Sequence, residues 1–268
     1  LIRSDGTSVY ITQDIGTAMQ RFEDFPELKG MIYTVGNEQE YHFKTLFLIL
    51  KKIGIKWTNM LHHLSYGMVD LPDGKMKSRE GNVIDADDLM SKMKTTAKEI
   101  SSKLGKLEGY SNTKKNDLYQ KISLGALKYY ILKVDPRKTI LFDPEKSIDF
   151  NGNTGPFIQY AYARIQSILK GNKINPEIPM PKKLDSKEIL IIKQLIHYPE
   201  IVEQSLKSLS PAIISNYIYE LVKRFNSFYQ NVTILGAESV VTKSFRLILL
   251  KNVAKTLNNS CSLLGISL

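Results

Sequence analysis

The sequence has only one cysteine, Cys261, and four histidines among its 268 residues. A single cysteine excludes an intrachain disulfide framework, and no histidine has the spaced cysteine companions of a zinc site. His62 and His63 are neighbours in an expected strand, so their side chains point to opposite faces and cannot bind one metal ion together. We therefore expect no metal site and a reducing, cytoplasmic location.

Long apolar runs are absent as well. No stretch approaches the roughly 20 apolar residues that a membrane helix needs, so we expect no membrane-spanning segment. The chain starts Leu1-Ile2-Arg3, with neither an initiator methionine nor the layout of a signal peptide. We expect this start to be a cut, with part of a larger protein preceding it.

Acidic residues are outnumbered by basic ones. The 37 lysines and arginines exceed the 27 aspartates and glutamates, which gives a formal net charge of +10. A charge of this sign attracts polyanions, either nucleic acid or an acidic membrane surface. The 43% of hydrophobic residues is enough for one large or two ordinary domain cores, so a folded chain is expected.

The first part of the chain has the pattern of a parallel α/β unit. Residues 31–35 form a short apolar strand flanked by glycines, the amphipathic helix that follows ends at Gly54, and a second apolar segment covers residues 61–69. A strand, a helix and a strand in this order form a right-handed parallel crossover. The segments after the two strands, residues 36–39 and 70–81, are therefore expected at one edge of the sheet, where ligands bind.

Helical signals dominate from Asp85 onward. The clearest later helices are predicted to begin near Pro156, at Asp185 with Glu188 three residues on, at Pro211 after Ser210, and near Glu238. A helical bundle is the natural architecture for such a series of helices.

The predicted fold is therefore mixed α/β followed by all-α. Residues 1–95 are interpreted as the carboxy-terminal part of a Rossmann-like parallel domain, residues 96–150 as a connecting helical stem, and residues 151–268 as an α-helical bundle. The change in character near residue 150 is the predicted domain boundary.

Three cations, Lys75, Lys77 and Arg79, lie within five residues of a loop flanked by Gly74 and Gly81. Such a loop can close over phosphate oxygens and neutralise the charge that develops when the α-phosphorus of a triphosphate is attacked. The alternative is a solvated basic loop, which the local pattern alone favours by about two to one.

Tyr10 and Asp14 are spaced by one helical turn. If Asp14 opens a helix, an aromatic ring and a carboxylate can meet one ligand, and this combination suits a guanidinium. The alternative, favoured by the local pattern, is that Asp14 caps the helix and Tyr10 packs in the core. Gln39, just past the first strand, is an uncharged donor and acceptor in the pocket position, although a surface glutamine is the commoner explanation. A structural role is equally open for His42.

Tyr160 and Arg164 share a face of the helix predicted from Pro156 to Leu169, away from its apolar stripe. A tyrosine and an arginine one turn apart can hold an unstacked base, and base stacking contributes about 1 to 3 kcal/mol. An exposed tyrosine beside a solvated arginine explains the spacing equally well.

Taken together, these segments resemble the arginyl-tRNA synthetases, in one order over nearly the whole chain. The resemblance implies a class I ligase that activates arginine with ATP and transfers it to the 3′ end of its tRNA. It implies ATP with Mg²⁺ as a substrate, no tightly bound cofactor, and a monomer that binds arginine, ATP and an arginine-accepting tRNA. The motifs that carry it are Leu1-Ile2-Arg3-Ser4-Asp5-Gly6-Thr7, Tyr10-Ile11-Thr12-Gln13-Asp14, Val35-Gly36-Asn37-Glu38-Gln39, Gly74-Lys75-Met76-Lys77-Ser78-Arg79 and Asn153-Thr154-Gly155-Pro156-Phe157-Ile158-Gln159-Tyr160-Ala161-Tyr162-Ala163-Arg164-Ile165.

The resemblance also implies roles for single residues. Tyr10, Asp14 and Gln39 would line the arginine pocket, with Asp14 pairing the guanidinium of the substrate. Tyr160 and Arg164 would meet the anticodon, because their motif resembles the opening of the family's anticodon-binding domain.

The basic loop would bind the phosphates of ATP through Gly74, Lys75, Met76, Lys77 and Ser78, with Lys75 and Lys77 as the catalytic cations. It departs from the usual Lys-Met-Ser-Lys-Ser pattern, because Lys77 replaces the first serine and Ser78 stands where the second lysine is expected. Which cation meets the pyrophosphate is therefore open.

The family's other signature, His-Ile-Gly-His, is nowhere in the sequence. We therefore expect this chain alone to bind tRNA without forming arginyl-adenylate. One alternative is a non-catalytic tRNA-binding or interaction module, which would keep Tyr160 and Arg164 while tolerating loss of Lys75 and Asp14. Another is a different class I synthetase, such as one for cysteine or methionine, although these commonly use metal-ligating cysteines.

Overall fold

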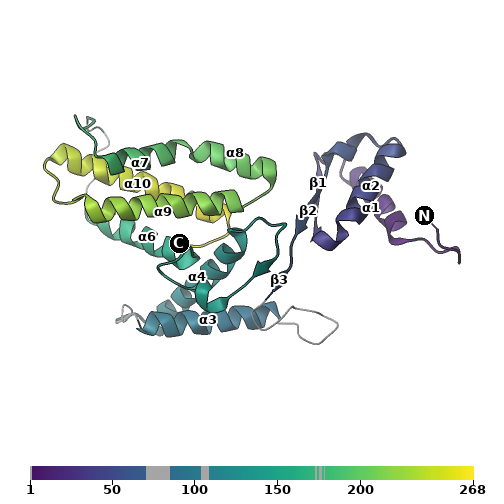
Figure 1. Cartoon of the computed structure of the whole chain (residues 1–268), viewed down its shortest axis with the longest axis horizontal. Helices are drawn as coiled ribbons and strands as arrows, with labels where there is room; N and C mark the ends of the chain where they lie inside the picture. Colours follow the sequence, from purple (N-terminus) through teal and green to yellow (C-terminus); the bar gives the residue numbers. More distant parts are fainter. Residues whose placement is uncertain (1, 71–84, 104–108, 173, 175–176, 178) are drawn as a thin grey trace. The chain divides into compact units, whose positions relative to one another are not determined.

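The computed structural model describes two compact units (Figure 1). Unit 1 comprises Leu1–Met68 with Pro136–Thr139, and unit 2 comprises Val69–Asp135 with Ile140–Leu268. The described residues are 2–70, 85–103, 109–172, 174, 177 and 179–268. The predicted boundaries at residues 95 and 150 stay a prediction.

Unit 1 contains a pair of parallel strands and two longer helices. Strand β1 pairs with β2 in parallel, with Met31 opposite Leu61 and Gly36 opposite Tyr66. The predicted strand, helix and strand are thus confirmed. The elements in chain order are α1 (Tyr10–Asp24), β1 (Met31–Gly36), η1 (Asn37–Gln39), α2 (Glu40–Lys52), η2 (Lys56–Met60) and β2 (Leu61–Tyr66).

The core of unit 1 follows from the apolar periodicity of its helices. Leu46 and Leu50 of α2 and Ala18 of α1 are fully buried, because residues three to four apart lie on one helix face. Helix α2 gives way to a turn at Gly54, whose φ of 88° is in the left-handed region that favours glycine. The buried residues of this core are Ala18, Met31, Phe43, Leu46, Leu50 and Leu61.

Unit 2 is mainly helical. The helices predicted near Pro156, Asp185, Pro211 and Glu238 are confirmed as α6, α7, α9 and α10, and α7 begins with the capping box expected of Asp185. Helices α6, α7 and α8 each pack against α9 (Figure 1). The elements are β3 (Val69–Asp70), α3 (Ala86–Lys103), α4 (Asn112–Leu132), β4 (Ile140–Leu141), α5 (Pro144–Ser147), α6 (Gly155–Leu169), α7 (Ser186–Ile196), α8 (Tyr198–Ser208), α9 (Ala212–Asn231) and α10 (Val240–Leu263).

The stem helices α3 and α4 have a core of their own within unit 2. Met93, Ala126 and Phe142 are fully buried there. The short parallel pair of β3 and β4 closes this region, and the backbone N–H of Phe142 donates to the carbonyl of Asp70 at 2.7 Å. The sequence did not predict this pair, because two residues per strand leave no periodic pattern to detect.

Helices α4 and α6 approach closely at two glycines. A Cβ atom on Gly155 would lie 2.2 Å from the backbone oxygen of Gly125, so only glycine fits. Thr154 caps α6, because its Oγ1 accepts from the N–H of Phe157. The hydroxyl of Tyr129 on α4 donates to Oδ1 of Asn153 at 2.6 Å. The motif that opens α6 therefore fixes this helix against α4.

A buried ion pair connects the first turn of α7 to α10. Glu188 is 1% exposed, and its Oε1 lies 2.6 Å from Nε of Arg246. Its Oε2 accepts from the backbone N–H of Asp185 at 2.7 Å. Both carboxylate oxygens are thus bound, which offsets the cost of burying the charge.

Replacing Gly155 by alanine is expected to destabilise unit 2 by at least the roughly 1–3 kcal/mol typical of overpacked cores. The new methyl group meets backbone, which cannot rotate away. Chemical denaturation measures the change. Gly16→Ala in α1 is the matched control, because a Cβ there meets nothing within 4 Å and alanine favours helix by about 1 kcal/mol. Equal stability of the two variants would contradict the close approach.

Cys261 of α10 provides a probe of the bundle, because it is the sole cysteine and burial raises the pKa of its thiol to about 12. We expect negligible reaction with a disulfide reagent near pH 8 in the folded chain and complete reaction in denaturant. Because folding favours the protonated thiol, this contribution to stability is present below pH 9.0 and is lost as the pH rises towards 12. Rapid labelling of the native chain would show that α10 opens readily.

Candidate functional site

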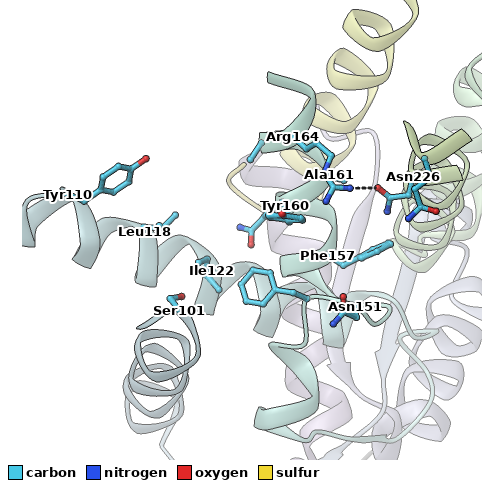
Figure 2. Close-up of a pocket in the computed structure, with 14 residues that line it drawn as sticks. Ser101, Tyr110, Leu118, Ile122, Asn151, Phe157, Tyr160, Ala161, Arg164 and Asn226 are labelled. Carbon is cyan, nitrogen blue, oxygen red and sulfur yellow. Dashed lines mark hydrogen bonds between the residues drawn. The ribbon is translucent and has the colours of Figure 1, made fainter. Parts of the chain in front are cut away.

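A pocket of about 660 Å³ opens between the stem helices and the bundle of unit 2 (Figure 2). Its volume falls within the range of about 300–1,000 Å³ common for small-molecule sites. Apolar side chains from α4 and α6 form much of its wall, and α6 also supplies the guanidinium of Arg164. Hydroxyl and amide groups reach the pocket from other elements, among them Ser101 of α3 and Asn226 of α9. It is lined by Ser101, Tyr110, Leu118, Ile122, Phe150, Asn151, Phe157, Gln159, Tyr160, Ala161, Ala163, Arg164, Asn226 and Gln230.

Tyr160 and Arg164 both line this pocket, on the shared face of α6 that their spacing predicts (Figure 2). The guanidinium carbon of Arg164 lies 4.8 Å from the ring centre of Tyr160 and 4.9 Å from that of Tyr229 on α9. Its Nη1 donates to Oδ1 of Asn226 at 3.3 Å. The ring of Phe150 meets that of Tyr160 edge-on, with centres 6.4 Å apart.

Two buried polar atoms of the pocket have no hydrogen-bond partner among the described residues. They are Oγ of Ser101, a residue that is 6% exposed, and Oε1 of Gln159. The amide nitrogen of Gln159 is used, since it donates to the carbonyls of Lys121 and Ser267 at 3.0 and 2.8 Å. Buried polar atoms are normally hydrogen-bonded, so these two can be satisfied by a ligand with polar edges.

The second group of predicted residues lies in unit 1. Helix α1 begins at Tyr10, with Val9 as an N-cap that makes no side-chain bond. The prediction that Asp14 opens or caps this helix is therefore wrong, because Asp14 lies in its second turn. Tyr10 is 75% exposed, so its predicted packing in the core is wrong too.

Asp14 forms a polar pair with His42 of α2. The distance between Oδ2 of Asp14 and Nε2 of His42 is 2.6 Å, and the two side chains are 41% and 25% exposed. This contact joins α1 to the first turn of α2, directly after Gln39, which is exposed at the end of η1. The sequence left His42 open to a structural role, since nothing in it indicates a contact across 28 residues.

Two further polar side chains, those of His63 and Tyr33, contact Phe43, as His42 does. Nε2 of His63 lies 3.0 Å from the carbonyl of Val35, which fixes that ring beside Phe43. The hydroxyl of Tyr33 is buried without a partner among the residues that the structure describes. Burial raises the pKa of Tyr33, and the charge of Asp14 raises it further while Arg21 opposes the change.

The predicted loop of Gly74, Lys75, Met76, Lys77 and Ser78 lies outside the described residues. Among residues 2–70, 85–103, 109–172 and 179–268, no group of three or more histidines, cysteines or acids could hold a metal ion. In the same residues no helix is both long and apolar enough to cross a membrane.

Comparison with known families identifies the class. A family model described as the catalytic domain of class I tRNA synthetases (R) matches residues 1–143, and one described as the DALR anticodon binding domain matches residues 158–268. Because the first match covers more than half of the chain, the chain belongs to the class I tRNA synthetases. The second match includes Arg164, Asn226 and Tyr229.

Curated relatives name one particular member of this class. The chain is 60% identical over 266 residues to arginine–tRNA ligase of Flavobacterium psychrophilum, a match that covers 99% of this chain and 44% of that protein. It is 54% identical over 271 residues to arginine–tRNA ligase of Bacteroides thetaiotaomicron, covering 99% and 45%. The predicted resemblance is thus confirmed, and the chain spans less than half the length of these relatives.

Solved structures share the fold. The arginyl-tRNA synthetase of Thermus thermophilus matches with a TM-score of 0.88 at 23% identity, over 99% of this chain and 50% of that one. The enzyme from Plasmodium falciparum matches with a TM-score of 0.82 at 24% identity, over 100% and 45%. The predicted α/β region followed by a helical bundle is thereby confirmed.

Asp14→Asn is expected to cost about 1 kcal/mol of stability or less, because a pair this exposed contributes little to folding. Glu188→Gln is the matched comparison and is expected to cost about 3–5 kcal/mol, because it leaves Arg246 without its carboxylate. Urea denaturation of both variants measures the difference. A cost of several kcal/mol for Asp14→Asn would assign Asp14 a structural role instead of a ligand-binding one.

Proposed function

We propose that this chain supplies the carboxy-terminal part of an arginine–tRNA ligase, which activates arginine with ATP and transfers it to the 3′ end of its tRNA. The observation that carries the proposal is the match of residues 1–143 and 158–268, in that order, to a class I catalytic domain and an anticodon-binding domain. The names of relatives that are 60% and 54% identical support arginine as the amino acid.

In this proposal Asp14 binds the guanidinium of the arginine substrate. His42 occupies Oδ2 of Asp14, and within the described residues no hydrogen bond is made to Oδ1. A guanidinium has several N–H donors, and the unbound Oδ1 of Asp14 can accept from it, as can the second lone pair of Oδ2. Tyr10, one turn earlier on α1, and Gln39, next to the start of α2, would complete the pocket.

ATP, with Mg²⁺ as part of the substrate, would meet the basic loop. Lys75 and Lys77 would neutralise charge on the phosphates as the carboxylate of arginine attacks the α-phosphorus and pyrophosphate leaves. The neighbours Gly74, Met76 and Ser78 would shape the loop around them. The charge on the attacked phosphate is where cations lower the barrier most.

The pocket of unit 2 would receive a base of the anticodon. Tyr160 offers a ring for stacking, and Arg164 offers N–H donors beside it. Every arginine codon has guanine at its middle position, so the middle base of the matching anticodon is cytosine. The edge of cytosine carries the acceptors O2 and N3 side by side, which fits the donors of a guanidinium.

The test is a titration of the chain with an arginine-accepting tRNA transcript and with the same transcript carrying a changed middle anticodon base. We expect the change to weaken binding by about 1–3 kcal/mol, and Tyr160→Ala or Arg164→Ala to remove this preference. Both complexes should weaken with salt, because phosphate contacts are common to both. Fluorescence anisotropy at two or more salt concentrations measures both effects.

Tyr41→Ala is the matched control, because Tyr41 lies in unit 1 and is 82% exposed. It should keep the full preference. Equal binding of the two transcripts by the unaltered chain would contradict anticodon reading and favour an interaction module with another partner.

A further inference from the structure

Two arginines of unit 2 are held in contrasting ways. Arg246 belongs to a buried ion pair, in which its Nε lies 2.6 Å from Glu188, and its Nη1 donates to the carbonyl of Thr233 at 2.7 Å. Its charge is neutralised by a carboxylate, and two of its nitrogens donate inside the protein. This is the arrangement of a structural arginine, because removal of either partner would leave a buried charge unpaired.

Arg164 is held by uncharged groups. The rings of Tyr160 and Tyr229 lie against its guanidinium, and the amide oxygen of Asn226 accepts from its Nη1. In the part of the chain that the structure describes, no ion pair includes Arg164. The side chain is therefore fixed while its positive charge stays uncompensated.

We propose that Asn226 and Tyr229 are positioning residues that set the guanidinium of Arg164 for base recognition. The inference rests on the proposed function, in which Arg164 contacts an anticodon base. Figure 2 shows the bond from Arg164 on α6 to Asn226 on α9 at the pocket. Asn226 lies three residues before Tyr229, so both project from one side of α9.

A guanidinium with a fixed orientation can distinguish one base from another by the positions of the acceptors on the base. A loose arginine can meet any phosphate or carbonyl oxygen, because its long side chain adopts many rotamers. Asn226 accepts one of the five N–H bonds and sets the plane of the group, which leaves donors in fixed directions for a base with adjacent acceptors. Loss of Asn226 or Tyr229 would leave the charge in place, so general affinity for RNA would persist while base preference falls.

The experiment measures the ratio of Kd values for the two transcripts that differ in the middle anticodon base. Asn226→Leu removes the acceptor at similar volume, and Tyr229→Leu removes the ring. Each is expected to reduce the ratio by about threefold to tenfold, because a hydrogen bond or ring contact to a charged group is lost. The affinity for the changed transcript and the salt dependence of binding should stay as in the unaltered chain.

Two further variants separate positioning from folding. Asn226→Asp keeps an acceptor oxygen for Nη1 of Arg164, so its ratio of Kd values is expected to match that of the unaltered chain. Its negative charge is expected to weaken both complexes equally. Asn231→Ala is the matched control on the same helix, since among the described residues the amide of Asn231 bonds only to the carbonyl of Ser227 four residues earlier. It should leave the ratio unchanged.

The outcomes distinguish failure of this inference from failure of the proposed function on which it rests. An unchanged ratio in Asn226→Leu and Tyr229→Leu, with loss in Arg164→Ala, overturns the inference and leaves anticodon reading intact. An unchanged ratio in Arg164→Ala overturns base reading by this pocket, and the inference with it. Thermal melts identify folded variants, and if Asn226→Leu does not fold, comparison of Tyr229→Leu with Tyr229→Phe decides, because phenylalanine keeps the ring.

Discussion

The close approach of α4 and α6 is the constraint on which the architecture of unit 2 depends. Gly155 lies against the backbone of Gly125, so no Cβ atom separates the two helices at this point. This contact brings α6 beside the stem, and the pocket lies along the same pair of helices. The glycine that permits this packing therefore determines where α6 forms a wall of the pocket. The Asn153-Thr154-Gly155 motif, which is part of the resemblance to the family, has a structural role, because its three residues cap α6 and hold it against α4.

Charge is distributed in unit 2 according to burial. Where an ion is taken out of water, as at Glu188, both oxygens receive partners, because an unpaired buried charge is costly. Where a cation borders a pocket, as at Arg164, its neighbours are aromatic rings and an amide. The first arrangement stabilises the fold and the second keeps a charge available. The net charge of +10 thus has a use at particular positions as well as over the whole surface.

Local patterns made much of the fold predictable, whereas contacts between residues far apart in the sequence could not be predicted. The strand at residues 31–35 and the helices α7 and α10 follow from periodicity and capping residues, which act within a few residues. The start of α1 was missed because Val9 makes no side-chain cap. The face shared by Tyr160 and Arg164 was predicted, but their partner Asn226 was not, since 62 residues separate it from Arg164 and no pattern connects two helices.

The two candidate sites share one physical design. In unit 1 the carboxylate of Asp14 is held through a single oxygen by His42 from a different helix. In unit 2 the guanidinium of Arg164 is held through a single nitrogen by Asn226, also from a different helix. In each case a hydrogen bond to one atom restricts the rotation of the side chain, and among the described residues its other polar atoms make no hydrogen bond. Because Asn226 is uncharged, its hydrogen bond orients the guanidinium of Arg164 without neutralising the charge of that group.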